Sequence, residues 1–348
     1  MRPRLPRGVR YLVSSARTRR DYARTLAIRA ARFYHRDRWR FSLRRFGAYV
    51  DDIPIDRPIF VLGVQGGGTT LVTRTLLRHP EVVSMGGNSS FWVATDEMGF
   101  VRNRMVRLPP TLWSSSHRTD LVHPVFGASH DSMYASDALY GSYRNVAGDA
   151  NERDAAALRR LIREHIAVYA HDHRHARFLD KTHTLTLKIP YVEELLRGTS
   201  PHYVLVVRDP YSTCYRAIRR KPPAWASQPP YEEQLRLAAE HWANSVRTAL
   251  EDGPETGRFT VVRFEDFVRD PEATIRAMCD FTGLSFSDEL VPREGQSRPF
   301  GTLPSDTKWY PLFEDPWRNR VSAADIEIID SEVGDVAGEL GYAIAASG

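Results

Sequence analysis

The stretch Val61-Leu62-Gly63-Val64-Gln65-Gly66-Gly67-Gly68-Thr69-Thr70 contains the parts of an anion-binding turn. The apolar run that begins at Ile59 predicts a buried strand of a parallel sheet. Thr69 and Thr70 are typical helix caps, and we expect a helix from there to about Arg78. Glycines allow backbone N–H groups to converge, and the helix start adds its dipole. The stretch therefore predicts a cradle for a phosphate-type group at the end of a strand.

The spacing of Gly63 and Gly68 matches the start of a nucleoside-triphosphate P-loop. Thr69 stands where that loop has the lysine that reaches the β- and γ-phosphates. This difference argues against an ATP- or GTP-hydrolysing enzyme and against a P-loop kinase. A glycine turn that binds no ligand remains the alternative interpretation.

A second strand, 203–207, ends in Arg208-Asp209-Pro210. Ligands of open α/β sheets bind at the carboxyl ends of the strands, and a guanidinium binds phosphate oxygens in bidentate fashion. Arg208 is therefore a candidate ligand of a phosphate. The competing interpretation is a local ion pair between Arg208 and Asp209.

Strands and helices alternate along the rest of the chain, which predicts an α/β fold. We expect a P-loop-like parallel sheet flanked by helices, in one domain over residues 51–348. Within it, residues 86–151 are irregular and are expected to face the substrate, as is the loop 221–231. The pattern predicts strands at 82–83, 178–179 and 259–262, and helices at 154–171 (capped by Asp154), 187–197, 212–220, 231–250, 271–282 and 323–340.

The positive charge is concentrated at the N-terminus. Residues 1–50 carry 15 Arg and 2 Asp, a net charge of +13, so the remainder of a chain of net charge +5 carries −8. The pattern predicts a basic helical arm, which favours peripheral contact with an anionic membrane or an acidic partner. A solvated helical face or a disordered tail is the alternative. Nucleic-acid binding is disfavoured because no recognised module accompanies the charge.

Other compositional features narrow the class of protein. There is no apolar run of the roughly 18–20 residues that a membrane-spanning helix needs, and no secretory signal pattern. Cys214 and Cys279 are far apart and have no neighbours at metal-ligand spacing, so no metal site is predicted. A cytoplasmic location, with peripheral membrane contact as an option, is the resulting expectation.

Taken together, these motifs resemble the PAPS-dependent sulfotransferase family, in particular its bacterial and Golgi-type branch. The resemblance rests on the strand, Gly-x4-Gly-Thr-Thr, the following His-Pro, and the distant strand with Arg-Asp-Pro. Two further stretches agree with it: 178–183 with the family's acidic-Lys-Thr-Pro segment, and 262–272 with its Tyr-Glu-Asp-Leu segment. The match spans about residues 59–284 and excludes the N-terminal arm.

The resemblance implies roles for individual residues. Gln65, Gly66, Gly67, Gly68, Thr69 and Thr70 would hold the 5′-phosphosulfate of PAPS. Arg208 would hold the 3′-phosphate, and Phe264 falls where the family often has a Tyr near the nucleotide, although it is also suited to the core. Lys181 would lie near the transferring sulfuryl group or the acceptor hydroxyl. The product would be PAP.

The chain also departs from the family pattern. Gly66 and Gly67 replace the usual cation and Ser of the loop, so another residue must supply that charge. Arg216 replaces a Ser that helps to bind the 3′-phosphate, a change that keeps an anion site. The family's carboxylate base is absent around 84–88. His183 is the best local candidate for a base, with Asp180, Asp96 and Glu97 as rivals.

The resulting hypothesis is a sulfotransferase that moves a sulfuryl group from PAPS to a hydroxyl of a small-molecule, sugar or lipid acceptor, with glycolipids included. The alternatives are a non-catalytic relative that binds PAP, another anion or a membrane, and a P-loop kinase. Oligomeric state is left open. The aromatic residues Phe91, Trp92, Trp113, Tyr134, Tyr140 and Trp225 are compatible with an apolar or sugar-like acceptor, and equally with ordinary packing.

Overall fold

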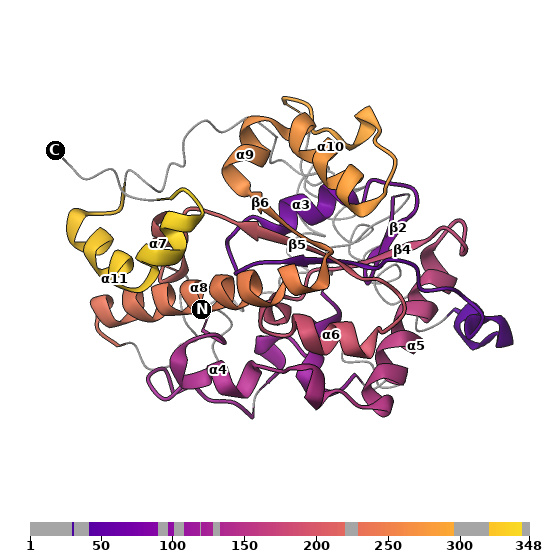
Figure 1. Ribbon diagram of the computed structural model, residues 1–348, viewed down its shortest axis with the longest axis horizontal. Coiled ribbons are helices and arrows are strands. Elements are labelled where there is room, and N and C mark those ends of the chain that lie inside the picture. Colours follow the sequence, from indigo (N-terminus) through magenta and orange to yellow (C-terminus); the bar gives the residue numbers. More distant parts are fainter. Residues whose placement is uncertain are drawn as a thin grey trace, which may run out of the picture.

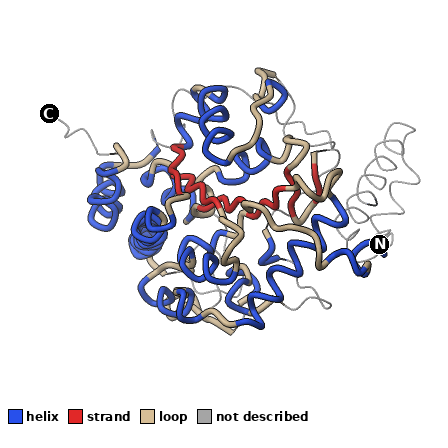
Figure 2. Tube along the Cα trace, turned by 45° about the vertical axis from the view of Figure 1, so that its right-hand side comes forward, coloured by secondary structure: helices blue, strands red, loops and turns tan. Residues whose placement is uncertain are grey.

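A six-stranded sheet forms the middle layer of the computed structural model, with helices on both of its faces (Figure 1). The structure describes residues 30, 42–89, 97–100, 108–118, 120–127, 133–219, 229–295 and 320–342. Seen from a second direction, the strands run through the centre of the molecule between the helices (Figure 2). The predicted α/β class, a parallel sheet flanked by helices, is confirmed.

The strand order in the sheet is β3-β2-β4-β1-β5-β6. All neighbouring pairs are parallel except β2 and β3, which form an antiparallel edge. In register, Ile59 of β1 pairs with Leu179 of β4 on one side and with His202 of β5 on the other. The strands are β1 Ile59–Leu62, β2 Val82–Ser84, β3 Gly87–Asn88, β4 Arg177–Asp180, β5 His202–Val207 and β6 Phe259–Arg263.

Helices connect these strands, and short 3₁₀ turns occur in the segments between the helices and strands. The α-helices are α3 Thr69–Leu76, α4 Asp137–Tyr143, α5 Glu152–Tyr169, α6 Ile189–Leu195, α7 Pro210–Ala217, α8 Tyr231–Asp252, α9 Phe264–Arg269, α10 Pro271–Thr282 and α11 Ala323–Glu339. The 3₁₀ turns are η1 Leu43–Phe46, η2 Ala48–Val50, η3 Met98–Phe100, η4 Pro110–Leu112, η5 Ser115–His117, η6 Ala147–Asp149, η7 His183–Leu187, η8 Pro254–Thr256 and η9 Asp288–Leu290.

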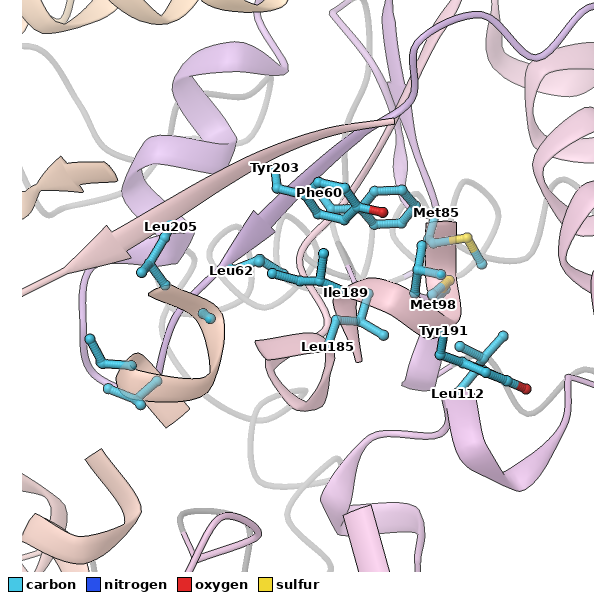
Figure 3. Packing of buried hydrophobic residues seen from close by; sticks show 14 of the residues in the cluster. Phe60, Leu62, Met85, Met98, Leu112, Leu185, Ile189, Tyr191, Tyr203 and Leu205 are labelled. Atoms are coloured by element: carbon cyan, nitrogen blue, oxygen red, sulfur yellow. The ribbon is translucent and has the colours of Figure 1, made fainter. Parts of the chain in front are cut away.

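Alternate residues of each strand feed two separate cores, because successive side chains of a strand point to opposite faces. Phe60 and Leu62 of β1 belong to the core under α5, α6 and α8, whereas Ile59 and Val61 belong to the core under α3 and α10. Figure 3 shows the first of these cores, where the rings of Phe60 and Tyr203 stack with centroids 5.6 Å apart. The central strand β1 is therefore fully buried and rigidly held, which fixes the loop that follows it.

Two helix starts differ from the sequence prediction. Gly68, in a left-handed conformation, precedes α3 without a side-chain cap, so the predicted threonine cap is wrong. Asn151 caps α5 by accepting from the Asp154 N–H, so the predicted Asp154 cap is also wrong. Helix α3 begins without a side-chain cap, and helix α5 begins before the residue that was predicted to cap it.

The described end of the basic N-terminal region packs onto the domain. Arg45 in η1 forms an ion pair with Glu164 of α5, with 2.7 Å between Nη2 and Oε2, and both side chains are buried. Val50 of η2 belongs to the main core. Apart from residue 30, the predicted helical arm lies outside the described residues up to position 41. Among the residues that are described, no helix is both long and apolar enough to cross a bilayer.

Residues 86–151, predicted to be irregular, consist in their described parts of β3, several 3₁₀ turns, loops and the helix α4. This segment crosses the carboxyl ends of the strands, because Met98 and Gly99 donate backbone hydrogen bonds to Asp180 and Thr182 just after β4. The segment therefore contributes directly to the region described next.

Candidate functional site

A cavity of about 490 Å³ lies at the carboxyl ends of β1, β4 and β5, within the range of ligand pockets. The chain leaves β1 toward β2 on one side, and later passes from β4 to β5 on the other, so the cavity sits at a topological switch point. The predicted site residues that line it are Gln65, Gly66, Gly68, Thr69, Thr70, Lys181, His183, Arg208, Arg216 and Phe264. Gly67 instead closes the turn through a hydrogen bond from its N–H to the Val64 carbonyl.

Glycine is required in the loop between β1 and α3 for two reasons. Gly66 and Gly68 have φ values of +91° and +95°, which L residues with side chains rarely adopt. A Cβ on Gly68 would also lie 2.0 Å from Cδ2 of Phe264. The Phe264 ring thus packs directly on the loop backbone, and the loop and the start of α3 line the cavity.

Two arginines converge at one end of the cavity, which we call the arginine end. Nη1 of Arg208 lies 3.2 Å from the Gly66 carbonyl oxygen, and Nη1 of Arg216 lies 3.5 Å from the same oxygen. The Arg208 guanidinium also lies over the Phe264 ring, 4.7 Å from its centroid. Guanidinium groups bind phosphate oxygens, and both of these side chains line the cavity. The arginine end is therefore suited to a phosphate.

The turn that carries Arg208 is held from several directions. The Asp209 carboxylate caps α7 by accepting from the Tyr211 N–H and the Ser212 hydroxyl. The Asp209 N–H in turn donates to Oε1 of Glu265, 2.9 Å away, and Glu265 Oε2 accepts from the Tyr342 hydroxyl. Asp209 therefore serves as a cap that fixes the end of β5, which positions Arg208 over the loop.

A second group of lining residues, which we call the lysine end, comprises a cation, a carboxylate and an imidazole. Lys181 Nζ lies 2.6 Å from Oε1 of Glu97, and His183 Nε2 lies 3.8 Å from the same oxygen. The side chains of Lys181, His183 and Glu97 are 6%, 12% and 13% exposed. Burial raises the pKa of Glu97, although the positive charge of Lys181 opposes this shift. The carboxylate is therefore a stronger base than one in water.

His183 is oriented by the loop. Its Nδ1 lies 2.7 Å from the Gly63 carbonyl oxygen, and a carbonyl can only accept, so Nδ1 carries the proton. Nε2 then faces Glu97 and the cavity. The imidazole links the strand end of β1 to the lysine end.

Asp180, one of the rival candidates for the base, does not line the cavity. Its side chain is fully buried, and its two oxygens accept from the Met98 N–H at 2.5 Å and the Thr182 N–H at 2.8 Å. Burial raises its pKa to about 7. Asp180 instead anchors the segment that carries Glu97. Asp96, another candidate, lies outside the described residues.

Several residues that line the cavity had no predicted role. Arg74 lies on the same face of α3 as Thr70, four residues earlier, and this spacing was a usable signal. Ser114, Ser115 and Thr184 gave no comparable signal, because only the path of distant segments brings them to the lysine end. The cavity-lining residues without an assigned role are Leu71, Arg74, Ser114, Ser115 and Thr184.

Of the two interpretations of the aromatic residues, ordinary packing holds for those that can be placed. Trp113 packs against the main core and donates its indole N–H to the Leu108 carbonyl. Tyr134 is fully buried in a small separate cluster, against which Tyr140 packs. Phe91, Trp92 and Trp225 lie outside the described residues.

Comparison with known proteins identifies the family. Residues 58–288 match the family model described as "Sulfotransferase family". A Caenorhabditis briggsae protein, provisionally named a protein-tyrosine sulfotransferase, is 24% identical over 235 residues, covering 67% of this chain and 68% of that protein. The solved Mycobacterium avium sulfotransferase STF9 shares the fold, with a TM-score of 0.50 and 15% identity over 84% of this chain and 78% of that one. Mouse sulfotransferase SULT7A1, solved with PAP, matches with a TM-score of 0.41 and 13% identity, over 84% of this chain and 91% of that one. The chain belongs to the sulfotransferase family.

Proposed function

We propose that this chain is a PAPS-dependent sulfotransferase that transfers a sulfuryl group to an acceptor hydroxyl. One observation carries the proposal: the same cavity is lined by the two arginines, the glycine loop and the lysine end. A donor with a phosphate at each of two positions matches the first two parts. A proton acceptor beside a cation, as transfer to a hydroxyl requires, matches the third.

The residues present fit the donor. Arg208 and Arg216 would bind its 3′-phosphate, which distinguishes PAPS from ordinary adenine nucleotides. The backbone N–H groups of the loop and the start of α3 would bind the 5′-phosphosulfate. The side chains of Arg74 and Lys181 line the same cavity and would supply the positive charge that Gly66 lacks.

When bound, PAPS supplies the sulfuryl group and leaves as PAP. In the overall transfer a bond forms between the acceptor oxygen and sulfur, the bond from sulfur to the phosphate oxygen breaks, and the acceptor proton goes to a base. We assign that base to Glu97, because its carboxylate is buried and its pKa is raised. Lys181 would stabilise the negative charge of the sulfuryl oxygens.

An ion pair with Lys181 weakens Glu97 as a base while the pair is intact. Once an anionic sulfuryl group competes for Lys181, the carboxylate loses part of that stabilisation and its basicity rises. Donor binding would therefore activate the base. His183 is the second candidate for the proton, since its Nε2 lies 3.8 Å from the same carboxylate oxygen.

Calorimetric titration with PAP, AMP and ATP tests the donor assignment, and release of ³⁵S-labelled product from labelled PAPS tests the chemistry. We expect PAP to bind at least tenfold tighter than AMP, because AMP lacks the 3′-phosphate. Preference for ATP would favour the kinase alternative. PAP binding without transfer to any acceptor would favour a non-catalytic relative, and binding of none of the three would contradict the proposal.

A further inference from the structure

The C-terminal helix α11 contacts the residues that surround the arginine end. It lies beside α7 and α8 (Figure 1), and its buried face belongs to the main core. The hydroxyl of Tyr211, in the first turn of α7, donates to Oδ1 of Asp330 on α11, 2.7 Å away. Helix α11 follows the stretch 58–288 that matches the family model. Its contacts with the site are therefore made by a part of the chain outside that match.

The end of α11 turns Tyr342 toward the sheet. The Gly341 N–H donates to the Gly338 carbonyl, and the Tyr342 N–H donates to the Ala337 carbonyl. Gly341 has a φ of +73°, and this conformation with these two hydrogen bonds is a Schellman motif, which ends a helix. The chain leaves the helix axis at this point, and Tyr342 becomes part of the main core, with 8% of its surface exposed.

Tyr342 contacts the residues on either side of Phe264. The Arg263 guanidinium lies over the Tyr342 ring, 4.4 Å from its centroid, and the Tyr342 hydroxyl lies 2.6 Å from Oε2 of Glu265. Burial and the negative charge of Glu265 raise the pKa of the Tyr342 hydroxyl, so it keeps its proton and acts as the donor. Phe264 itself lies under the Arg208 guanidinium. Tyr342 thus fixes the backbone on both sides of the ring that supports Arg208.

Glu265 connects Tyr342 to Arg208 itself. Its Oε2 accepts from the Tyr342 hydroxyl, and its Oε1 accepts from the Asp209 N–H, 2.9 Å away. A carboxylate with both oxygens bound is held in one orientation, as a supporting residue of a binding site must be. Because Asp209 directly follows Arg208, this hydrogen bond fixes the backbone from which the Arg208 side chain extends.

We infer that Tyr342 is a positioning residue of the donor site: through Glu265, it holds Arg208 and Phe264 in the arrangement that binds the 3′-phosphate. A guanidinium binds two phosphate oxygens at once only when its plane is correctly directed. A side chain that is already held in that direction loses less conformational entropy on binding. This inference rests on the proposed sulfotransferase function and gives the end of α11 a part in donor affinity.

Calorimetric titration of the full chain with PAP tests the inference. Tyr342→Phe removes the hydroxyl and leaves the ring over Arg263, so we expect the Kd for PAP to rise about 5–10-fold. The kcat at saturating PAPS should stay within about twofold of wild type, because the lysine end is unchanged. An unchanged Kd in Tyr342→Phe would overturn the inference.

Tyr191→Phe is the matched control for stability. The Tyr191 hydroxyl also donates to a carboxylate, that of Asp154, 2.9 Å away, but this pair joins α6 to α5. Both variants should lower the Tm, whereas only Tyr342→Phe should weaken PAP binding. Equal weakening of PAP binding in the two variants would indicate a general loss of stability and count against the positioning role.

A double-mutant cycle tests whether Tyr342 acts through Glu265. Glu265→Gln replaces one carboxylate oxygen by an amide nitrogen, which cannot accept a hydrogen bond, so this variant should also weaken PAP binding. Adding Tyr342→Phe to Glu265→Gln should then weaken binding by less than about twofold more. If Tyr342→Phe kept its full effect in that background, the tyrosine would act by another route and the inference would be wrong.

The same titrations distinguish the two proposals. If the wild-type protein fails to bind PAP, the proposed function fails and the positioning role fails with it. If the wild-type protein binds PAP and Tyr342→Phe binds it equally well, only the positioning role fails.

Discussion

The two ends of the cavity are both basic, but they differ in the residues that accompany their cations. At the arginine end, Arg208 and Arg216 converge on a neutral carbonyl oxygen. At the lysine end, Lys181 is paired with the carboxylate of Glu97 at 2.6 Å. A site that binds a phosphate is favoured by several positive charges close together. A site that removes a proton from the acceptor must also contain a base. The difference suggests that one end binds the donor and the other end carries out the reaction.

Loss of the carboxylate at the lysine end should have the largest effect. Glu97→Gln keeps the size of the side chain but cannot accept the acceptor proton, so we expect kcat to fall about 10²–10⁴-fold. The Kd for PAP, measured by calorimetry, should change little because the arginine end is intact. Glu272→Gln on the surface of α10 is the matched control. Near-normal kcat in Glu97→Gln, together with a large loss in His183→Asn, would move the base to His183.

Loss of an arginine should have the converse effect. Arg208→Ala removes charge-assisted hydrogen bonds to the 3′-phosphate and should weaken PAP binding about 100-fold or more. The kcat at saturating PAPS should fall far less than in Glu97→Gln. Arg276→Ala, half-exposed on α10, is the control. Wild-type PAP affinity in Arg208→Ala would refute the placement of the 3′-phosphate.

The lysine end should also set the acid limb of the pH profile. A base must be deprotonated to act, and burial raises the pKa of Glu97 above its ordinary value of 4.5. The kcat/KM should therefore fall as pH decreases through a midpoint above 4.5, by about tenfold per pH unit below it. Stopped assays from pH 4 to 9 would measure this limb. The limb should disappear in Glu97→Gln, and an unchanged limb in that variant would assign it to another group.

The smallest effect is expected at the second arginine. Arg216 lies farther from the Gly66 oxygen than Arg208 does, at 3.5 Å against 3.2 Å. Arg216→Ser restores the residue type of the resembling family and retains one hydroxyl, so PAP affinity should fall only about 3–10-fold. Titration at two salt concentrations should show a weaker salt dependence in the variant. A loss as large as that of Arg208→Ala would mean that the two arginines bind the phosphate as one unit.

Local sequence determined where the central strands end and which residues directly follow them. The run 59–62, the glycines after it and the Arg208 turn are each contiguous in sequence, and a buried strand followed by Gly or by Arg-Asp-Pro specifies its own geometry. Because parallel strands end at one edge of a sheet, the loop, Lys181 and Arg208 were predictable neighbours. The sequence was less informative about the helix caps. Thr69 or Thr70 and Asp154 were predicted to cap α3 and α5, but the residues at these positions are Gly68 and Asn151.

Tertiary structure alone decided which of the rival carboxylates lies beside Lys181 and His183. Glu97 is 84 residues from Lys181 in sequence, and it reaches the cavity because Asp180 anchors Met98 next to it. Asp180 and Lys181 are adjacent in sequence, yet one is turned into the protein and the other into the cavity. The presence of Ser114 and Ser115 in the cavity lining likewise depends on how the segment 86–151 crosses the sheet. Such contacts arise from long-range packing and buried hydrogen bonds, which leave no periodic signal in the sequence, whereas the glycine loop and Arg208 follow from the strands that carry them.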